Sequence, residues 1–356
     1  MNKKERKILI TAAILFLFEI LVLWFSSTCP EFAEWYTEHI YRVLTETVGR
    51  ITGILPFSAA ESGLYILILV LLVTFVGSVV RKEKVKWLCH VILMMTFLFL
   101  SFVLGCGINY HHVSFSEHSG VTAEGYSEQE LAEVCRWLTE KVNEMNDAVE
   151  RDADGLLRLT CDERDAAVEA MQHLGETYSV LEGYYPRAKK VLLSEILSWQ
   201  GITGIYSPFT IEANYNRDIA KYNLPFTVCH ELSHLRGFME EQEANFIAFL
   251  ACTESENREF QYSGYLLGWI YGMNELKILD EEQWREIRGS LEREIERDLQ
   301  ANSEFWKQYE GKIEEISNRI NDTYLKANGQ EQGVESYNRM VDYIISYYRL
   351  QIKNAG

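Results

Sequence analysis

Residues 227–245 read TVCHELSHLRGFMEEQEAN, a stretch in which two histidines, His230 and His234, are separated by three residues. On an α-helix this spacing places both imidazoles on one face, a turn apart, where they can bind a single metal ion. An apolar run at 224–229 precedes the pair and Gly237 follows it. Glycine readily ends a helix in the left-handed conformation. The stretch therefore predicts a helix that carries two metal ligands and ends at Gly237.

Acidic residues close to both histidines complete a candidate metal site. Glu231 stands beside the shared face, where its carboxylate can take a proton from a water bound to the metal. An acidic helix start follows the glycine, and in it Glu241 and Asn245 are four residues apart on one face. That spacing suits a third ligand at Glu241 and a second residue, Asn245, that orients one of the histidines. Two imidazoles and one carboxylate favour Zn²⁺.

The charge of the chain is concentrated in its later part. The 356 residues include 34 basic and 52 acidic residues, for a formal charge of −18. Up to Tyr110 there are 10 basic and 8 acidic residues, so the remaining 246 residues hold 24 and 44, a balance of −20. Nucleic-acid binding requires clustered Lys and Arg. The composition therefore argues against a nucleic acid as partner.

The first part of the chain has the pattern of a membrane domain, residues 1–110. Apolar runs at about 8–25, 63–80 and 87–108 are long enough to cross a bilayer, and 31–54 has the pattern of a helix lying at the membrane surface in contact with lipid. Eight of the first ten basic residues lie in the amino-terminal tail or at 81–86. Short basic segments stay cytoplasmic. We therefore expect a multi-pass cell-membrane protein with a cytoplasmic amino terminus and an extracytoplasmic domain at 111–356.

The extracytoplasmic part reads as mostly helical. Capping boxes at Ser127 and Thr160 predict helices to about Val149 and Val180. Further helices are expected at 188–200, 246–252 and 260–278, a long solvated pair at 280–308 and 312–320, a loop at 324–338, and a closing helix to about 349.

One segment, 201–216, breaks the helical pattern and reads as a strand or hairpin directly before the metal helix. Such a strand can pair with an extended peptide or simply cover the core, and the residues favour neither. The seven cysteines include no CxxC pair, which argues against a thiolate zinc finger. Cys135 and Cys161 can form a disulfide only if the fold brings them together.

With these residues in view, the chain resembles a family of bacterial membrane proteins classed as a domain of unknown function. The resemblance is most specific at 206–210, 225–226, 230–238, 241–246, 324–330, 333–334 and 336–337. More remotely, HExxH followed by Glu-x-x-x-Asn resembles the gluzincin peptidases, which implies Glu241 as third ligand and Asn245 as its supporting residue. A resemblance to metzincins implies Glu240 as ligand instead, and Glu243 is the next alternative.

The resemblance implies a mainly α fold, in which three transmembrane helices precede a mostly helical, zincin-like domain with a small β element before the metal helix. It also implies a zinc metalloendopeptidase that acts on a peptide or protein substrate, with His230, His234 and Glu241 as ligands and Glu231 as catalytic base. The developing oxyanion needs a hydrogen-bond donor, for which Tyr337 or Tyr324 is available, although a buried tyrosine more commonly serves packing. The alternative is a non-catalytic, membrane-tethered binding or sensor protein with a structural or vestigial metal site.

Overall fold

Helices make up 73% of the structure, which confirms the mainly α prediction, and a small sheet accompanies them. The structure is a computed structural model, and it describes residues 1–330, 332–333 and 339–355. The chain forms two units, which are described separately below. One comprises Met1–Val113 with Ser207–Glu212, and the other comprises Ser114–Tyr206 with Ala213–Gly356.

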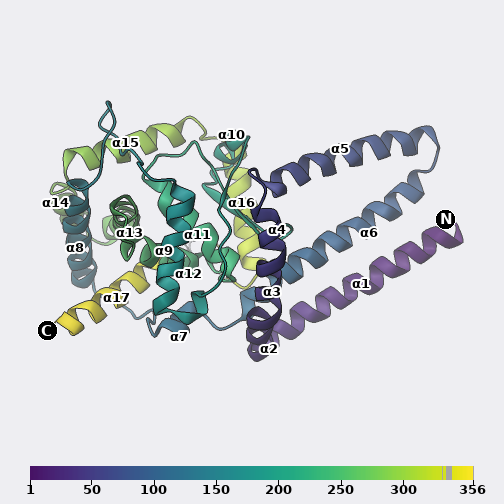
Figure 1. Cartoon of the computed structure of the whole chain (residues 1–356), viewed down its shortest axis with the longest axis horizontal. Helices are drawn as coiled ribbons and strands as arrows, with labels where there is room; N and C mark the ends of the chain where they lie inside the picture. The colour runs from purple at the N-terminus through teal and green to yellow at the C-terminus, as the bar shows by residue number, and fades with distance from the viewer. Residues whose placement is uncertain (331, 334–338, 356) are drawn as a thin grey trace. The chain divides into compact units, whose positions relative to one another are not determined.

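Three long apolar helices dominate the first unit, and α6 packs against both of the others (Figure 1). They are α1 (Lys3–Thr28), α5 (Ala59–Val80) and α6 (Lys84–Phe102), the last extended by π and 3-10 turns to His111. The 22 residues of α5 rise about 33 Å, which is enough to cross the hydrocarbon core of a bilayer. The most apolar 18-residue window of each of the three helices has a mean hydropathy between 2.5 and 2.7. Length and composition therefore support three membrane-spanning helices, as predicted.

Helices α1 and α5 begin several residues before their apolar runs because polar residues cap their amino termini. Asn2 and Glu5 form a capping box at the start of α1. Ser58 accepts a hydrogen bond from the Glu61 N–H (3.0 Å) at the start of α5. A nearly continuous helix between α1 and α5 consists of α2 (Pro30–Tyr36), α3 (Arg42–Leu44), α4 (Arg50–Gly53) and two intervening π turns. Its placement at a membrane surface remains a prediction.

The segment Ser207–Glu212 belongs to the first unit through contacts with α5 and with the turns after α6. The buried Glu212 carboxylate accepts hydrogen bonds from the N–H groups of Ala59 (3.2 Å) and Ala60 (2.9 Å). These are unpaired donors in the first turn of α5, where the helix dipole also favours an anion. Gly105 lies directly against Pro208, leaving no room for a side chain.

The second unit is built around three helices, α11 (Asn223–Arg236), α12 (Glu241–Thr253) and α13 (Arg258–Leu279). Every residue of α12 is buried, and so is every residue of α11 except the partly exposed His230. Helices buried all round lie at the centre of a core. The surrounding helices are α7 (Phe115–Ser119), α8 (Glu128–Asn146), α9 (Glu163–Thr177), α10 (Ser194–Trp199), α14 (Glu281–Arg288), α15 (Arg293–Lys307), α16 (Lys312–Ala327) and α17 (Met340–Ala355).

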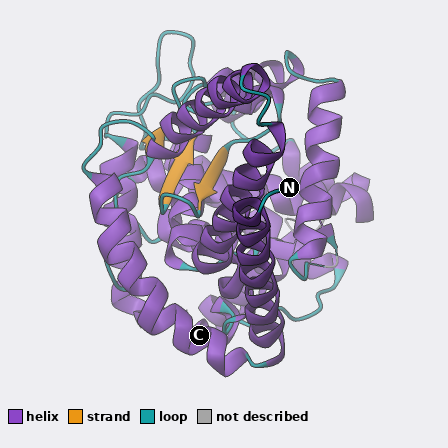
Figure 2. Ribbon diagram, turned by 90° about the vertical axis from the view of Figure 1, so that its right-hand side faces the viewer, coloured by secondary structure: helices purple, strands orange, loops and turns teal. Residues whose placement is uncertain are grey.

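Three short strands lie among these helices (Figure 2). They are β1 (Lys189–Lys190), β2 (Gly204–Ser207) and β3 (Glu212–Tyr215), arranged in the order β1-β3-β2. β1 runs parallel to β3, with Lys189 opposite Asn214. The β segment predicted at 201–216 is therefore present, and β2 lies at an edge of the sheet.

Several predicted helix boundaries are wrong. Residues 189–190 form strand β1 because β3 pairs with them, so the helix expected at 188–200 is reduced to α10. α9 is capped by Asp162 instead of Thr160, since the Asp162 carboxylate accepts the Arg164 N–H (3.0 Å). The predicted solvated pair consists of three helices, α14, α15 and α16, and α16 extends to Ala327 within the expected loop.

The disulfide considered between Cys135 and Cys161 is absent, and both thiols are free. Cys135 is buried on α8 against Gly272 of α13. The Cys161 thiol donates a hydrogen bond to the Glu259 carboxylate (3.1 Å).

Candidate metal centre

Helix α11 ends where the sequence predicts, and the turn that follows brings α12 back over it. Gly237 has a φ of 119°, in the left-handed region. Its N–H donates to the His234 carbonyl (3.0 Å), and the Phe238 N–H donates to the Ser233 carbonyl (3.2 Å). These bonds satisfy the last carbonyls of α11. α12 starts four residues later, so its first residue, Glu241, lies beside the two histidines.

Three potential ligand atoms converge at this point. His230 Nε2 and His234 Nε2 are 3.0 Å apart. Glu241 Oε2 lies 3.2 Å from His230 Nε2 and 3.5 Å from His234 Nε2. All three side chains are largely buried, with 10 to 12% of each exposed. Among the described residues, one other group of three His, Cys, Asp or Glu residues has its potential ligand atoms within 4.8 Å of one another.

These separations suit a tetrahedral zinc ion. Bonds of about 2.0 Å from zinc to nitrogen and oxygen place neighbouring ligand atoms about 3.3 Å apart in a regular tetrahedron. The observed triangle, with edges of 3.0, 3.2 and 3.5 Å, brackets that value. Three protein ligands leave the fourth tetrahedral position for water or substrate, as in catalytic zinc sites. The residues present therefore fit the ion that the sequence predicts.

The surroundings of the histidines orient their rings toward this point. His234 Nδ1 lies 2.8 Å from the Phe238 carbonyl, which cannot donate, so Nδ1 carries the proton and Nε2 offers its lone pair. The Asn245 side chain lies close enough to His230 to influence its pKa. This is the place the sequence predicts for a residue that supports a ligand.

Glu231 is 3% exposed, and its Oε2 has no hydrogen-bond partner among the described residues. The carboxylate packs directly against the backbone of Gly204, where a side chain would collide with it. Sequence reasoning missed Gly204, although a glycine inside a predicted strand can indicate a close approach of this kind. The first residue of edge strand β2 therefore lies at the predicted catalytic base.

A tyrosine from α13, Tyr271, completes the described surroundings. Burial, together with the charge of Glu241, raises its pKa to about 12, and the Asn245 side chain acts in the opposite direction. The hydroxyl therefore interacts electrostatically with a predicted ligand and stays protonated at neutral pH. The two tyrosines named from the sequence are placed differently. Tyr324 is 37% exposed on α16, and Tyr337 lies outside the described residues.

The sequence pattern of one family, DUF3810, described as a protein of unknown function, matches residues 36–345. The chain belongs to the DUF3810 family. The matched range includes the complete candidate metal centre of this DUF3810 chain. No curated protein and no solved structure matches it.

Burial and mutual charge shift the pKa values of the ligand groups. Burial would lower the pKa of His234, but Glu241 raises it to about 9, whereas burial and His234 together lower the pKa of His230. Burial acts to raise the pKa of Glu241, and the two imidazoles nevertheless hold it below its ordinary value. These shifts favour one positively charged imidazole, that of His234, beside the ionised Glu241 carboxylate and a neutral His230. In the absence of metal a proton supplies that charge, so metal binding must displace it.

The alternative carboxylates lie apart from the triangle. Glu240 is the residue before α12, and its carboxylate accepts a hydrogen bond from the Gln242 amide (2.6 Å). Glu243 accepts the Ser116 N–H (3.4 Å) at the start of α7. Burial raises the pKa of Glu243 to about 8, and the charge of Glu240 adds to the effect. Of the three candidate glutamates, the structure brings Glu241 to the histidines.

Proposed function

We propose that this protein is a membrane-anchored zinc metallopeptidase that hydrolyses peptide bonds in a peptide or protein substrate. One observation carries the proposal. Two imidazole nitrogens and a carboxylate oxygen lie at the mutual distances of a tetrahedral zinc site, with the Glu231 carboxylate next in sequence to a ligand. This arrangement of HExxH with a later glutamate on a second helix also supports the gluzincin-like relationship expected from the sequence.

The residues around the triangle have the properties that hydrolysis requires. When bound at His230, His234 and Glu241, Zn²⁺ would polarise the substrate carbonyl and acidify the attacking water. Burial raises the pKa of Glu231 to about 8, His234 lowers it and the charge of Glu241 raises it. Glu231 can therefore accept the proton of the attacking water at Oε2 and pass it to the leaving amine.

Tyr271 is the proposed donor to the developing oxyanion, because its hydroxyl is protonated and interacts electrostatically with Glu241. The substrate is proposed to lie along β2, the edge strand whose first residue contacts Glu231. An extended peptide can add to such an edge by main-chain hydrogen bonds.

The proposal is tested with the full chain purified in a neutral detergent. Zinc content is measured by mass spectrometry, and cleavage is measured on denatured casein. We expect one zinc per chain and detectable cleavage, with Glu231→Gln retaining zinc and losing cleavage. His230→Ala is expected to lose both. Cleavage by Glu231→Gln at the original rate would reject the role given to this residue.

Burial of the metal centre supports a second candidate, a non-catalytic binding or sensor protein with a structural metal site. Each ligand side chain is only 10 to 12% exposed. Replacing zinc with Co²⁺ and adding a hydroxamate distinguishes the two, since only an open coordination position lets the inhibitor change the visible spectrum. An unchanged spectrum, together with no cleavage, would favour the structural site.

A further inference from the structure

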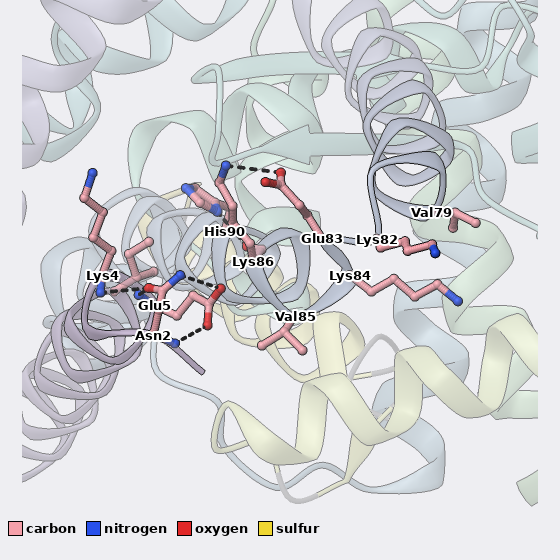
Figure 3. A pocket seen from close by; sticks show the side chains of 11 residues that line it. Asn2, Lys4, Glu5, Val79, Lys82, Glu83, Lys84, Val85, Lys86 and His90 are labelled. Carbon is pink, nitrogen blue, oxygen red and sulfur yellow. Dashed lines mark hydrogen bonds and ion pairs between the residues drawn. The ribbon is translucent and has the colours of Figure 1, made fainter.

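A cavity of about 700 Å³ lies in the first unit, where the start of α1 meets the turn between α5 and α6 (Figure 3). Its lining is rich in lysine, with Lys4, Lys82, Lys84 and Lys86, and also includes His90. Pockets for small ligands in proteins commonly measure 300 to 1,000 Å³, so this one is large enough for a phospholipid headgroup.

The carboxylates that line the cavity have partners of their own. Glu5 accepts hydrogen bonds from the Asn2 N–H (2.7 Å) and side-chain amide (3.1 Å). Glu83 pairs with Lys86 at 3.2 Å. In Figure 3 the ammonium ends of Lys82 and Lys84 point away from both carboxylates.

Three cations remain uncompensated. Lys4, Lys82 and Lys84 carry no ion pair within the described part of the chain. Figure 3 shows Lys4 on one side of the cavity and Lys82 and Lys84 on the other, so an anion bound between them would be attracted from both sides. The ligand should therefore carry negative charge.

The rest of the lining is apolar and lies at the ends of predicted membrane spans. Ile8 comes from α1, Val79 from the last turn of α5, and Val85 from the first turn of α6. A free phosphate gains nothing from such surface, whereas the glycerol and upper acyl chains of a lipid do. Basic pockets between transmembrane helices are known to hold anionic headgroups.

We propose that this cavity binds the phosphate headgroup of an anionic phospholipid, with Lys4, Lys82 and Lys84 neutralising the headgroup and the three aliphatic side chains contacting its chains. The proposal is independent of the metal centre, which belongs to the other unit. A lysine near an anionic lipid contributes about fivefold in affinity, so the three together should contribute roughly 100-fold.

The test uses the full chain in a neutral detergent and native mass spectrometry. The probes are phosphatidylglycerol, phosphatidylcholine and inorganic phosphate. We expect phosphatidylglycerol to bind in preference to the other two. The variant K4Q/K82Q/K84Q should weaken that binding roughly 100-fold, and K4R/K82R/K84R should retain it.

The matched control is K3Q/K7Q/R81Q, which removes three positive charges from the same two segments but from side chains that do not line the cavity. It should change the affinity by less than about fivefold, because exposed charges outside the cavity are screened. The amino-terminal tail and the 81–86 turn together hold eight basic residues, and each Gln triple keeps five of them. The positive charge that orients the spans in the membrane is therefore the same in both variants. Circular dichroism confirms that each variant is folded.

Three results would overturn the proposal. Equal weakening by the two Gln triples would indicate diffuse attraction instead of a site. Binding of inorganic phosphate as tight as that of phosphatidylglycerol would show that the cavity recognises phosphate and not a lipid. Equal binding of phosphatidylcholine would show that the lysines do not select for charge.

Discussion

At the scale of single residues, the candidate metal centre combines groups that are close in sequence with groups that are not. His230, His234 and Glu241 fall within twelve residues, and the geometry of one helix and one turn brings them together. Gly204 and Tyr271 reach the same place from a strand and from a later helix. Spacing rules apply within a helix, which is why the two histidines were predictable. Glu241, on the next helix, had Glu240 and Glu243 as alternatives, and no spacing rule pointed to Gly204 or Tyr271.

Gly204→Ala should abolish or strongly reduce cleavage while zinc stays bound. The new methyl group collides with the Glu231 carboxylate, so the base must move, whereas the ligands are untouched. Cleavage rate and zinc content of the purified variant are the measurements. Gly77→Ala is the control, since open space surrounds that glycine. Unchanged cleavage by Gly204→Ala would contradict the contact between β2 and Glu231.

Tyr271→Phe should lower kcat by about 100-fold and leave zinc content and KM nearly unchanged. Loss of one donor to an oxyanion costs about that much, because the donor acts mainly in the transition state. Steady-state kinetics on a fluorogenic peptide separate the two parameters. Tyr324→Phe on the exposed face of α16 serves as control. A rise in KM at constant kcat would assign Tyr271 to substrate binding instead.

At the scale of elements, helices with clear caps and apolar periodicity were predictable, and those decided by pairing were not. Ser127 caps α8 as expected. Residues 188–200 looked helical, yet β3 pairs with 189–190 and shortens the helix to α10. Pairing partners lie far away in sequence, so a local window contains no sign of them. The Glu163 carboxylate of α9 bonds to side chains of both β1 and β3 in this sheet.

The Glu163 contact should make stability depend on pH. Its carboxylate accepts the Tyr215 O–H (2.6 Å) and pairs with Lys190 (2.8 Å). Burial acts to raise the pKa of Glu163, but Lys190 and Tyr215 hold it below its ordinary value. The folded pKa is below the unfolded one, so the stabilisation is present above about pH 4.5 and is lost as the pH falls through the folded pKa.

Glu163→Gln should therefore lower the free energy of unfolding by about 2 kcal/mol at pH 7 and by less at pH 4. Denaturant unfolding of the full chain followed by tryptophan fluorescence measures both values. Glu169→Gln, on the exposed side of the same helix, is the control. An equal loss at both pH values would show that the charge of Glu163 does not stabilise the contact.

At the scale of the whole molecule, composition separates a membrane unit from a strongly acidic unit. Three helices are long and apolar enough to span a bilayer, and the basic residues gather in the tail before α1 and in the turn before α6. If the three helices cross the membrane, two spans separate the tail from the turn, which would place both on the same side. This is the physical basis for the proposed extracytoplasmic position of the metal centre.

Reporter fusions test this orientation. Alkaline phosphatase joined after Val113 should be active, because the enzyme requires the oxidising exterior, and the same reporter joined in the 81–83 turn should be inactive. A fluorescent-protein reporter that folds only in the cytoplasm should show the opposite pattern. Phosphatase activity at the 81–83 fusion alone would place the metal centre inside the cell.

Local sequence patterns were enough to predict the features that depend on neighbours along the chain: three apolar spans, the helix that carries His230 and His234, its end at Gly237, and the short distance to Glu241. Tertiary packing sets which glutamate joins the histidines and which tyrosine interacts with that glutamate, and it places a glycine of an edge strand against Glu231. It also gathered Lys4, Lys82 and Lys84 around one cavity. Hydrophobic and helical periodicity act over a few residues, whereas packing joins residues whose separation in sequence has no regular relation to their distance in space.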